Sequence, residues 1–523
     1  MNVGAYMTRA AKHYPDRLAA VFEDRRFTYV ELNRRTDSFA KALKSLGIQK
    51  GDRIGILQKN SNCFLETLFA CFKIGACAIP MNFRIHPNDV AYHLNDARAA
   101  AVVFSGDFNR SIQEITGKTS HTRHFIALKN PLEAQLDYER LVSENVTSED
   151  QTIEIDEEDL AWLFYTSGTT GKPKGAMLTH KNLVATSVGW CADLMHLEPE
   201  DIALQAAPLS HGGGIHAIAV IAKAGANVIL DGWKSKEVLE YIENYKITNT
   251  WAVPTMIKML ITDPDIERFD LSSLKWFVYG GSPMYVGDLK EAIKKIGPVF
   301  VQIFGQGESP MTGTFMRKED HVIDGDPKQE ERLLSAGIAR TDMEVKILDE
   351  NDREVPTGCK GEISLRGPAV MKGYWERPEE NAATLRGGWL HTGDIGYKDK
   401  NGYVYIVDRF KDLIISGGSN IYPRELEEVI VHHPAVQEVA IIGVPDEFWG
   451  EAVKACIVLK PGRSATREDI IEFCIQNMAG YKKPKSIEFL DALPKSNYGK
   501  VLKRSLRERY VKNSMMVQND CKP

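Results

Sequence analysis

The segment Tyr165-Thr-Ser-Gly-Thr-Thr-Gly-Lys-Pro-Lys-Gly175 decides how this chain is interpreted. It follows an apolar run that predicts a buried strand, and it precedes a helix expected to begin near His180. Three glycines and four Ser/Thr hydroxyls form a flexible loop, to which two lysines add positive charge. Such a loop is suited to wrapping phosphate oxygens. It is not a Walker A loop, because Gly168 and Gly171 are too close together and Pro173 stands where the magnesium-binding hydroxyl would follow the lysine.

Apolar runs alternate with amphipathic stretches from about Leu32 to Phe300. Short apolar runs predict buried strands, and longer amphipathic stretches predict helices. The predicted strands are 53–57, 100–104, 161–165, 227–230 and 277–279, and the predicted helices are 32–46, 64–73, 181–194 and 286–296. This alternation predicts the α/β class, with a parallel-rich sheet and helical crossovers.

The pattern changes after about Asp320. Turn pairs such as Thr357-Gly358 and Asn401-Gly402 separate short predicted strands at 344–348, 362–366 and 403–407, which indicates a β subdomain over about 321–408. A further compact unit has predicted strands near 439–442 and 455–459 and predicted helices near 423–432 and 467–478. We therefore predict a large N-terminal domain over 1–408 and a small α+β C-terminal domain over 409–523.

The composition is that of a soluble globular protein, with 523 residues of which 43% are hydrophobic and 26% are charged. The net charge of −6, without long single-sign runs, argues against a nucleic-acid partner. The first residues lack the apolar core of a signal peptide, and no apolar run approaches the length that crosses a membrane, so we expect neither secretion nor a membrane span. Eight cysteines without a C-x-x-C pair make a zinc ribbon or a disulfide framework improbable. We expect a cytoplasmic protein without an integral membrane segment, either a monomer or a homodimer.

Charge is distributed unevenly along the chain. Residues 409–523 hold 18 basic and 15 acidic side chains, whereas the whole chain is negative. The basic excess gathers near the end, at Lys482, Lys483, Lys485, Lys495, Lys500, Lys503 and Arg504. Two interpretations stay open: a solvated basic surface, or a small domain that closes over an anionic ligand held by the large one.

The glycine-rich loop resembles the phosphate-binding loop of the adenylate-forming enzymes, which include acyl-CoA synthetases, firefly-type luciferases and peptide-synthetase adenylation domains. Five further segments resemble other motifs of this family and follow in its order. They are Phe304-Gly-Gln-Gly-Glu308, His391-Thr-Gly-Asp394, Asp408-Arg-Phe-Lys-Asp412, Ser416-Gly-Gly-Ser-Asn-Ile-Tyr-Pro423 and Pro494-Lys-Ser-Asn-Tyr-Gly-Lys500. The chain is identified as a member of the family, which implies that its domain 1–408 binds AMP and the acyl group and that its domain 409–523 is mobile.

The resemblance implies a site for ATP and Mg²⁺. Adenylation joins a carboxylate to the α-phosphate of ATP, so a mobile lysine that bridges the two anions can neutralise their charge. The resemblance assigns this role to Lys500. Glu308 and Thr166 are implied as the Mg²⁺ ligands. Asp394 is implied as the acceptor for the ribose hydroxyls, with Arg409 beside it. The implied ATP- and AMP-binding residues are Thr166, Ser167, Gly168, Thr169, Thr170, Gly171, Lys172, Gly281, Ser282, Phe304, Gly305, Asp394 and Arg409.

The resemblance also implies a second half-reaction, in which the thiol of coenzyme A attacks the acyl carbonyl. The C-terminal domain would rotate about Lys411, and Gly418 would line the tunnel for the pantetheine arm. His211 resembles a gate to this tunnel, whereas we interpret His216 as a core histidine. The implied acyl- and CoA-binding residues are His211, Gly213, Gly280, Gly305, Gly417 and Gly418.

Several positions depart from the family pattern. Gly307 stands where a threonine is usual, and Phe304 replaces the commoner tyrosine. Family members that activate acetate or propionate carry a tryptophan at the place of Gly305, so a glycine is expected to leave the acyl pocket open, and Gly212–Gly214 are expected to add volume. Each CH₂ group buried in such a pocket contributes about 0.8 kcal/mol. We therefore predict a medium- or long-chain fatty acid, or an aromatic or alicyclic acid, rather than acetate.

These residues predict an acyl-CoA ligase that forms acyl-AMP and pyrophosphate and then transfers the acyl group to CoA. The nearest alternative is a stand-alone adenylation enzyme that loads a carrier protein in trans, because CoA and a carrier present the same arm. A luciferase-like oxygenase has no local support. A catalytically dead scaffold would not need the residues named above, and a kinase would release ADP rather than AMP.

Overall fold

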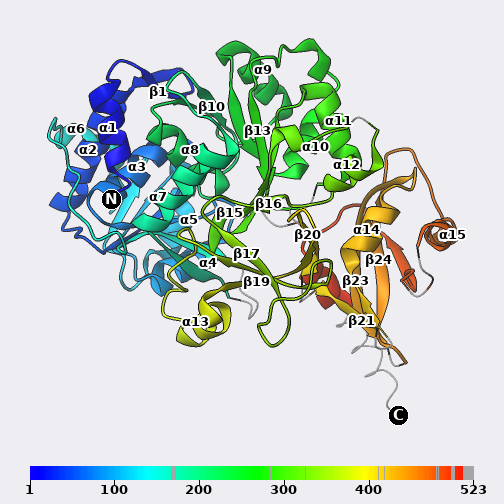
Figure 1. Cartoon of the computed structure of the whole chain (residues 1–523). Coiled ribbons are helices and arrows are strands. Elements are labelled where there is room, and N and C mark those ends of the chain that lie inside the picture. The colour runs from blue at the N-terminus through cyan, green and yellow to red at the C-terminus, as the bar shows by residue number, and fades with distance from the viewer. Residues whose placement is uncertain are drawn as a thin grey trace. The chain divides into compact units, whose positions relative to one another are not determined.

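The computed structural model describes residues 1–166, 172–282, 284–323, 325–409, 412–416, 419–446, 448–478, 480, 482–495 and 501–510 (Figure 1). Internal contacts divide the chain into two compact units. The first consists of Met1–Val345 and Ser364–His391, and the second of Lys346–Ile363 and Thr392–Pro523. The fold is α/β, as predicted, while the domain boundary after residue 408 stays a prediction.

A seven-stranded sheet in the first unit holds the strand that precedes the glycine-rich loop. Its order is β7-β6-β5-β3-β4-β8-β9. The bounds are β3 Arg53–Leu57, β4 Cys77–Pro80, β5 Ala101–Phe104, β6 His124–Ala127, β7 Leu136–Asp137, β8 Leu160–Thr166 and β9 Lys174–Thr179. All pairs are parallel except β8 and β9, which form an antiparallel hairpin. The loop therefore joins two strands, and the predicted helix at His180 begins only after β9.

A nine-stranded sheet in the same unit has the order β16-β15-β14-β13-β12-β10-β11-β1-β2. The bounds are β1 Leu18–Phe22, β2 Arg25–Thr28, β10 Ile202–Gln205, β11 Ala226–Ile229, β12 Asn249–Ala252, β13 Trp276–Gly280, β14 Phe300–Gln306, β15 Ser309–Met316 and β16 Ile338–Ala339. Its central strands are parallel, and the pairs β1–β2, β14–β15 and β15–β16 are antiparallel. The sequence predicted the parallel strands but not their division between two sheets.

Helices of the first unit cover these sheets. Their bounds are α1 Ala5–His13, α2 Tyr29–Ser45, α3 Asn62–Lys73, α4 Pro87–Asp96, α5 Asn109–Thr116, α6 Tyr138–Glu144, α7 His180–Gly189, α8 Gly212–Ala222, α9 Ser235–Tyr245, α10 Pro254–Ile261, α11 Val286–Ile296, α12 Pro327–Arg332 and α13 Pro378–Thr384. Capping boxes at Thr28 and Thr179 begin α2 and α7. Helices α9, α10 and α11 lie together beside β13, where their apolar faces bury Leu239, Ile257 and Leu289 (Figure 1).

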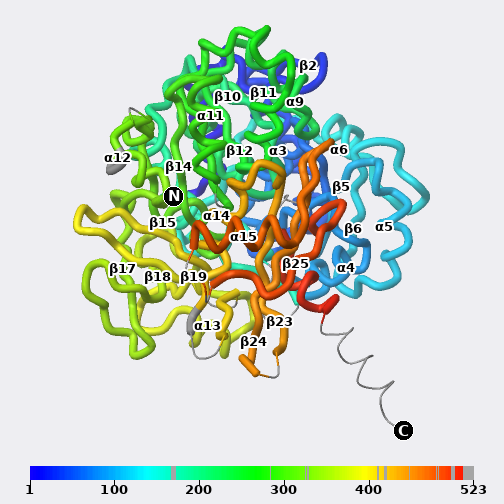
Figure 2. Tube along the Cα trace, turned by 90° about the vertical axis from the view of Figure 1, so that its right-hand side faces the viewer, coloured from blue at the N-terminus to red at the C-terminus, as the bar shows by residue number. Residues whose placement is uncertain are grey.

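Strands β17 Glu344–Leu348, β18 Gly361–Arg366, β19 Leu390–Lys398 and β20 Val404–Arg409 form a four-stranded sheet in this order. They confirm the predicted strands at 344–348, 362–366 and 403–407. In the second unit, β21 Ile414–Ser416, β22 Ser419–Ile421, β23 Val436–Asp446, β24 Gly450–Leu459 and β25 Ser486–Phe489 form a further sheet. Helices α14 Pro423–Ile430 and α15 Arg467–Asn477 pack on it (Figure 2). The α+β class of this part is as predicted.

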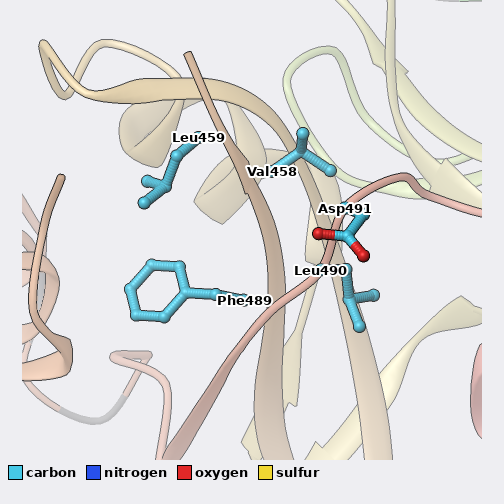
Figure 3. Close-up of a pocket in the computed structure, with 5 residues that line it drawn as sticks. All are labelled: Val458, Leu459, Phe489, Leu490 and Asp491. Atoms are coloured by element: carbon cyan, nitrogen blue, oxygen red, sulfur yellow. The ribbon is translucent and has the colours of Figure 1, made fainter. Parts of the chain in front are cut away.

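The ends of β24 and β25 border a cavity of about 320 Å³, lined by Val458, Leu459, Phe489, Leu490 and Asp491 (Figure 3). These five residues belong to none of the sequence motifs described above. Within the described ranges, we find no helix that has both the length and the apolar character needed to cross a membrane.

Four buried histidines give the fold a dependence on pH. Burial lowers the pKa of His93, His180, His216 and His321 from 6.5 to about 4 each. Between these values the unfolded chain binds more protons than the folded chain, so stability rises with pH across this window and falls as the pH drops through it.

We therefore expect the unfolding temperature to be nearly constant from about pH 8 to pH 6.5 and to fall between about pH 6.5 and pH 4.5. The check is thermal unfolding measured by circular dichroism across this range. His93 stacks on Tyr165 with ring centroids 4.2 Å apart, so His93→Phe keeps the stacking and removes one titrating group. In this variant the decrease in unfolding temperature between pH 6.5 and pH 4.5 is expected to be smaller by roughly 2–4 °C. An unfolding temperature that does not change between pH 6.5 and pH 4.5 would contradict the prediction.

Candidate active site

The carboxyl ends of β8 and β14 come together in the first unit. Thr166 ends β8, and Glu308 lies in the turn that follows β14. The Thr166 hydroxyl donates a hydrogen bond of 2.8 Å to Glu308 Oε1, although β8 and β14 belong to different sheets. The carboxyl ends of parallel strands are where α/β folds bind ligands. The structure thus brings together the two side chains that the sequence predicted as metal ligands.

Tyr374 joins this pair, although the sequence analysis did not single it out. Its hydroxyl donates a hydrogen bond of 2.7 Å to the same Glu308 Oε1. The segment around it pairs with β9, where Met177 N donates to Gly373 O at 2.8 Å and Trp375 N donates to Gly175 O at 2.8 Å. Burial and the nearby carboxylate raise the pKa of Tyr374 well above its usual value, so the phenol stays protonated and donates. No motif spacing could have linked residues this far apart in sequence.

A carboxylate and a hydroxyl are hard oxygen donors of the kind that Mg²⁺ binds in proteins. Among the described residues, no group of three or more His, Cys, Asp or Glu side chains could hold a metal. The oxygen atoms of Thr166 and Glu308 are of the type that coordinates a nucleotide-bound Mg²⁺.

The two lysines of the loop lie in different environments. Lys174 is buried, with its Nζ 5.2 Å from the centroid of the Tyr374 ring and 3.5 Å from Glu380 Oε1. Lys172 is exposed, and its Nζ lies 5.7 Å from the centroid of the Tyr92 ring. Lys172, which the resemblance assigned to ATP, is thus the lysine that solvent reaches.

The departure at Gly307 has a steric reason. A Cβ atom at this position would lie 2.4 Å from Thr166 Cγ2 and 2.7 Å from Phe164 Cδ1. A threonine there would collide with both side chains unless they moved. The glycine, which lacks the hydroxyl of the usual threonine, therefore allows the turn after β14 to pack closely against the end of β8.

His211 lies next to this corner. It precedes α8, and its half-buried ring meets the Phe164 ring edge-on at a centroid distance of 4.9 Å. Its Nδ1 is 3.1 Å from Ser210 Oγ. Burial lowers the pKa of His211 to about 3, so the imidazole is neutral at ordinary pH. His216, by contrast, is fully buried and its Nε2 lies 2.8 Å from Asn249 Oδ1, which agrees with its interpretation as a core histidine.

The glycines after His211 do not all add volume. A Cβ atom on Gly213 would lie 2.7 Å from Ala207 O, and one on Gly214 would lie 2.1 Å from Leu209 O. These two glycines instead allow the first turn of α8 to approach the backbone of 207–209, so the expectation of added volume is wrong for them. At Gly212 a Cβ atom would meet the side chains of Met311 and Trp251.

Gly305 also has a packing reason. A Cβ atom there would lie 2.7 Å from both Met311 N and Ser309 O, because β14 and β15 form a tight hairpin. The space beside Gly305 is therefore filled by backbone, and the expectation that this glycine leaves a pocket open is not met. Phe304 is buried, and its ring atom Cδ1 lies 3.1 Å from where a Cβ atom on Gly313 would be.

A buried ion pair holds this hairpin and was not predicted. Met311 has a φ of +61°, which is rare for a residue with a side chain, and its carbonyl accepts a 2.9 Å hydrogen bond from Arg340 Nη1. Arg340 is buried and pairs with Asp193 at 3.2 Å. Asp193 lies in a π-helical turn, Trp190–Leu194, where the predicted helix 181–194 departs from α-helical geometry.

The loop after β13 carries Gly280, Gly281 and Ser282. A Cβ atom on Gly280 would lie 2.4 Å from Ile303 O, so this glycine permits the close approach of β14. Gly281 has a φ of +81°, which favours glycine.

In the second unit, Asp394 and Arg409 face each other in the antiparallel pair β19–β20. Asp394 is buried, and its backbone N–H donates to Thr392 Oγ1 at 3.1 Å. The side chain of Arg409 lies outside the described part of the chain. The pairing brings together the two residues assigned to the ribose by resemblance.

The remaining predicted site residues lie outside the described residues. They are Ser167, Gly168, Thr169, Thr170, Gly171, Lys411, Gly417, Gly418 and Lys500.

Comparisons with known proteins agree with these motifs. The family described as AMP-binding enzyme matches residues 7–375, and the AMP-binding enzyme C-terminal domain matches residues 425–500. A feruloyl-CoA synthase from Amycolatopsis sp. is 36% identical over 97% of this chain and 99% of its own length. The fatty acid–[acyl-carrier-protein] ligase ScoC from Streptomyces coeruleorubidus is 34% identical over 97% of this chain and 96% of its own length.

Among solved structures, ATP-bound MatB from Rhodopseudomonas palustris is similar to this chain, with 29% sequence identity and a TM-score of 0.88. The similarity covers 98% of this chain and 99% of MatB. Family, relatives and structure thus agree over nearly the full length. The chain belongs to the AMP-binding enzyme family.

Proposed function

We propose that this chain, an AMP-forming acid–CoA ligase, activates a medium- or long-chain fatty acid or an aromatic or alicyclic acid rather than acetate. The observation that carries the adenylation step is the corner at which Thr166, Glu308 and Tyr374 meet, at the entrance to the glycine-rich loop. This corner supplies oxygen ligands for a nucleotide-bound metal. It adjoins a loop whose sequence is rich in hydrogen-bond donors for phosphate oxygens.

In the first half-reaction, a carboxylate oxygen of the acid attacks the α-phosphorus of ATP and pyrophosphate leaves. In the proposal Lys500 bridges the two anions as they approach, and the loop 166–172 surrounds the phosphates. Glu308 and Thr166 would hold Mg²⁺, which supplies charge neutralisation for the departing pyrophosphate. Asp394 accepts hydrogen bonds from the ribose, with Arg409 beside it.

In the second half-reaction, the thiol of CoA attacks the acyl carbonyl and AMP leaves. We assign rotation of residues 409–523 to a hinge at Lys411, and passage of the pantetheine arm to Gly417 and Gly418. His211 acts as the gate beside Phe164. Because the low pKa of His211 keeps its ring neutral, the gate adds no charge to the route of the thiol.

The substrate class rests on the relatives and not on the pocket glycines. The names of two relatives, a feruloyl-CoA synthase and a fatty acid–[acyl-carrier-protein] ligase, refer to an aromatic acid and to a fatty acid. Gly305, Gly213 and Gly214 do not support the argument, because the space beside each is filled by backbone.

The test is pyrophosphate release with ATP and Mg²⁺ over acids from acetate to palmitate, with benzoate, cinnamate, ferulate and cyclohexanecarboxylate. Each acid is assayed with CoA, with a phosphopantetheinylated carrier protein and with neither. We expect turnover that depends on CoA, with AMP as the product. Turnover with the carrier alone would favour the alternative acceptor, and a preference for acetate would contradict the substrate class.

We also propose that the enzyme acts in the cytoplasm as a monomer or homodimer. Light scattering coupled to size-exclusion chromatography measures the oligomeric state directly.

A further inference from the structure

We propose that Tyr374 is a positioning residue that orients the Glu308 carboxylate so that a single oxygen faces the metal site. This inference rests on the proposed function of Glu308 as a Mg²⁺ ligand. Tyr374 itself touches neither substrate nor metal in the proposal, and it acts through the carboxylate.

Two donors converge on one carboxylate oxygen. The hydroxyls of Thr166 and Tyr374 donate to Glu308 Oε1 at 2.8 and 2.7 Å. Glu308 Oε2 accepts no hydrogen bond from the residues that the structure describes. Hydrogen bonds to a charged acceptor are short and strong, so two of them on Oε1 set the rotation of the carboxylate. Oε2 is left with its lone pairs for a cation.

The same geometry orients Thr166. A hydroxyl has one hydrogen and two lone pairs, and the hydrogen of Thr166 points at Glu308. Its lone pairs therefore point away from the carboxylate. Thr166 Oγ1 and Glu308 Oε2 are then the two oxygens available to one cation.

Tyr374 is held in place from several sides. Its backbone N–H donates to Asn381 Oδ1 at 2.5 Å, and its carbonyl accepts from Asn381 Nδ2 at 3.0 Å. Trp375 continues the pairing with β9, and the Lys174 ammonium lies over the phenol ring. The side chain is buried, so water cannot readily replace its hydroxyl on Glu308. Such support is what keeps a ligand in a productive orientation.

A carboxylate that presents one oxygen favours Mg²⁺ over Ca²⁺. Mg²⁺ is small, requires nearly octahedral geometry and is commonly bound through one or two protein oxygens while it keeps waters. Ca²⁺ is larger and often takes both oxygens of a carboxylate. With Oε1 occupied by two hydroxyls, Glu308 cannot bind in this bidentate way.

The experiment measures ATP binding by isothermal titration calorimetry on the full chain, without the acid substrate, so that no turnover occurs. Titrations are made with Mg²⁺, with Ca²⁺ and with EDTA. For Tyr374→Phe we expect the gain in ATP affinity produced by Mg²⁺ to fall about 10- to 100-fold, because the carboxylate loses one of the two hydrogen bonds that orient it. The affinity in EDTA is expected to stay within 2-fold of the wild type, roughly the scatter of such measurements.

A matched control is Tyr138→Phe. The Tyr138 hydroxyl donates to Glu66 Oε2 at 2.8 Å, which is also a buried tyrosine–glutamate hydrogen bond, but in a different part of the first unit. We expect Tyr138→Phe to lower the unfolding temperature and to leave the effect of Mg²⁺ on ATP binding unchanged. Equal loss of ATP affinity with and without Mg²⁺ in Tyr374→Phe, or no change in either, would overturn the proposal.

Wild-type protein provides a second test that does not depend on a variant folding. We expect Mg²⁺ to increase ATP affinity at least about 10-fold more than Ca²⁺ does. An equal increase in ATP affinity with the two ions would overturn the inference. Failure of the proposed function is recognised separately. In that case wild-type protein would release no pyrophosphate with any acid, and Glu308→Gln would bind ATP with the same dependence on Mg²⁺ as the wild type.

Discussion

Replacing Glu308 with glutamine is expected to lower the rate of acyl-adenylate formation by about 10²- to 10³-fold while the protein stays folded. Glutamine has nearly the same shape as glutamate. Its amide oxygen can still accept hydrogen bonds from the hydroxyls of Thr166 and Tyr374. What is lost is the negative charge beside the phosphate loop. Pyrophosphate release at saturating acid and ATP measures the effect, and circular dichroism confirms the fold.

The second half-reaction is the internal control for Glu308→Gln. Supplied with synthetic acyl-adenylate and CoA, the variant should form acyl-CoA within about 3-fold of the wild-type rate, because no pyrophosphate takes part in that step. If Glu308→Gln kept more than a tenth of the wild-type adenylation rate, the assignment of Glu308 to the metal would be wrong.

The Lys500→Ala variant is expected to lose adenylation by about 10³-fold and to keep the transfer of a supplied acyl-adenylate to CoA. The first step brings two anions together, and without a cation between them their repulsion adds to the barrier. The second step breaks the bond to AMP and uses a thiol, so it does not need the same bridge. The measurement is the rate of each half-reaction separately.

Lys495→Ala is the matched control for Lys500→Ala. Lys495 belongs to the same motif, and its Nζ lies 2.7 Å from Glu438 Oε2 in a partly exposed ion pair. Such pairs contribute only about 0–1 kcal/mol, so we expect less than about a 3-fold change in either half-reaction. Equal losses in the two half-reactions of Lys500→Ala, or a loss in Lys495→Ala as large as in Lys500→Ala, would contradict the assignment.

The fold was largely predictable because its elements are local. The predicted strand 53–57 coincides with β3, and the predicted helix 286–296 coincides with α11. In both, the apolar spacing alone indicates the element, since period and length suffice. The helix predicted over 181–194 was less accurate. Its last turn becomes π-helical where Asp193 reaches Arg340, a partner that lies far along the chain.

The sequence by itself determined the family, the order of the motifs and the identity of most candidate site residues, because these depend on residue type and spacing. Only the tertiary structure decided which strands share a sheet, since strand pairing depends on contacts between distant segments. It also decided that Tyr374 reaches Glu308, and that Gly305 faces a neighbouring backbone instead of open space. A glycine in a sequence is compatible with either a cavity or a close approach, and only the position of the neighbouring atoms distinguishes the two.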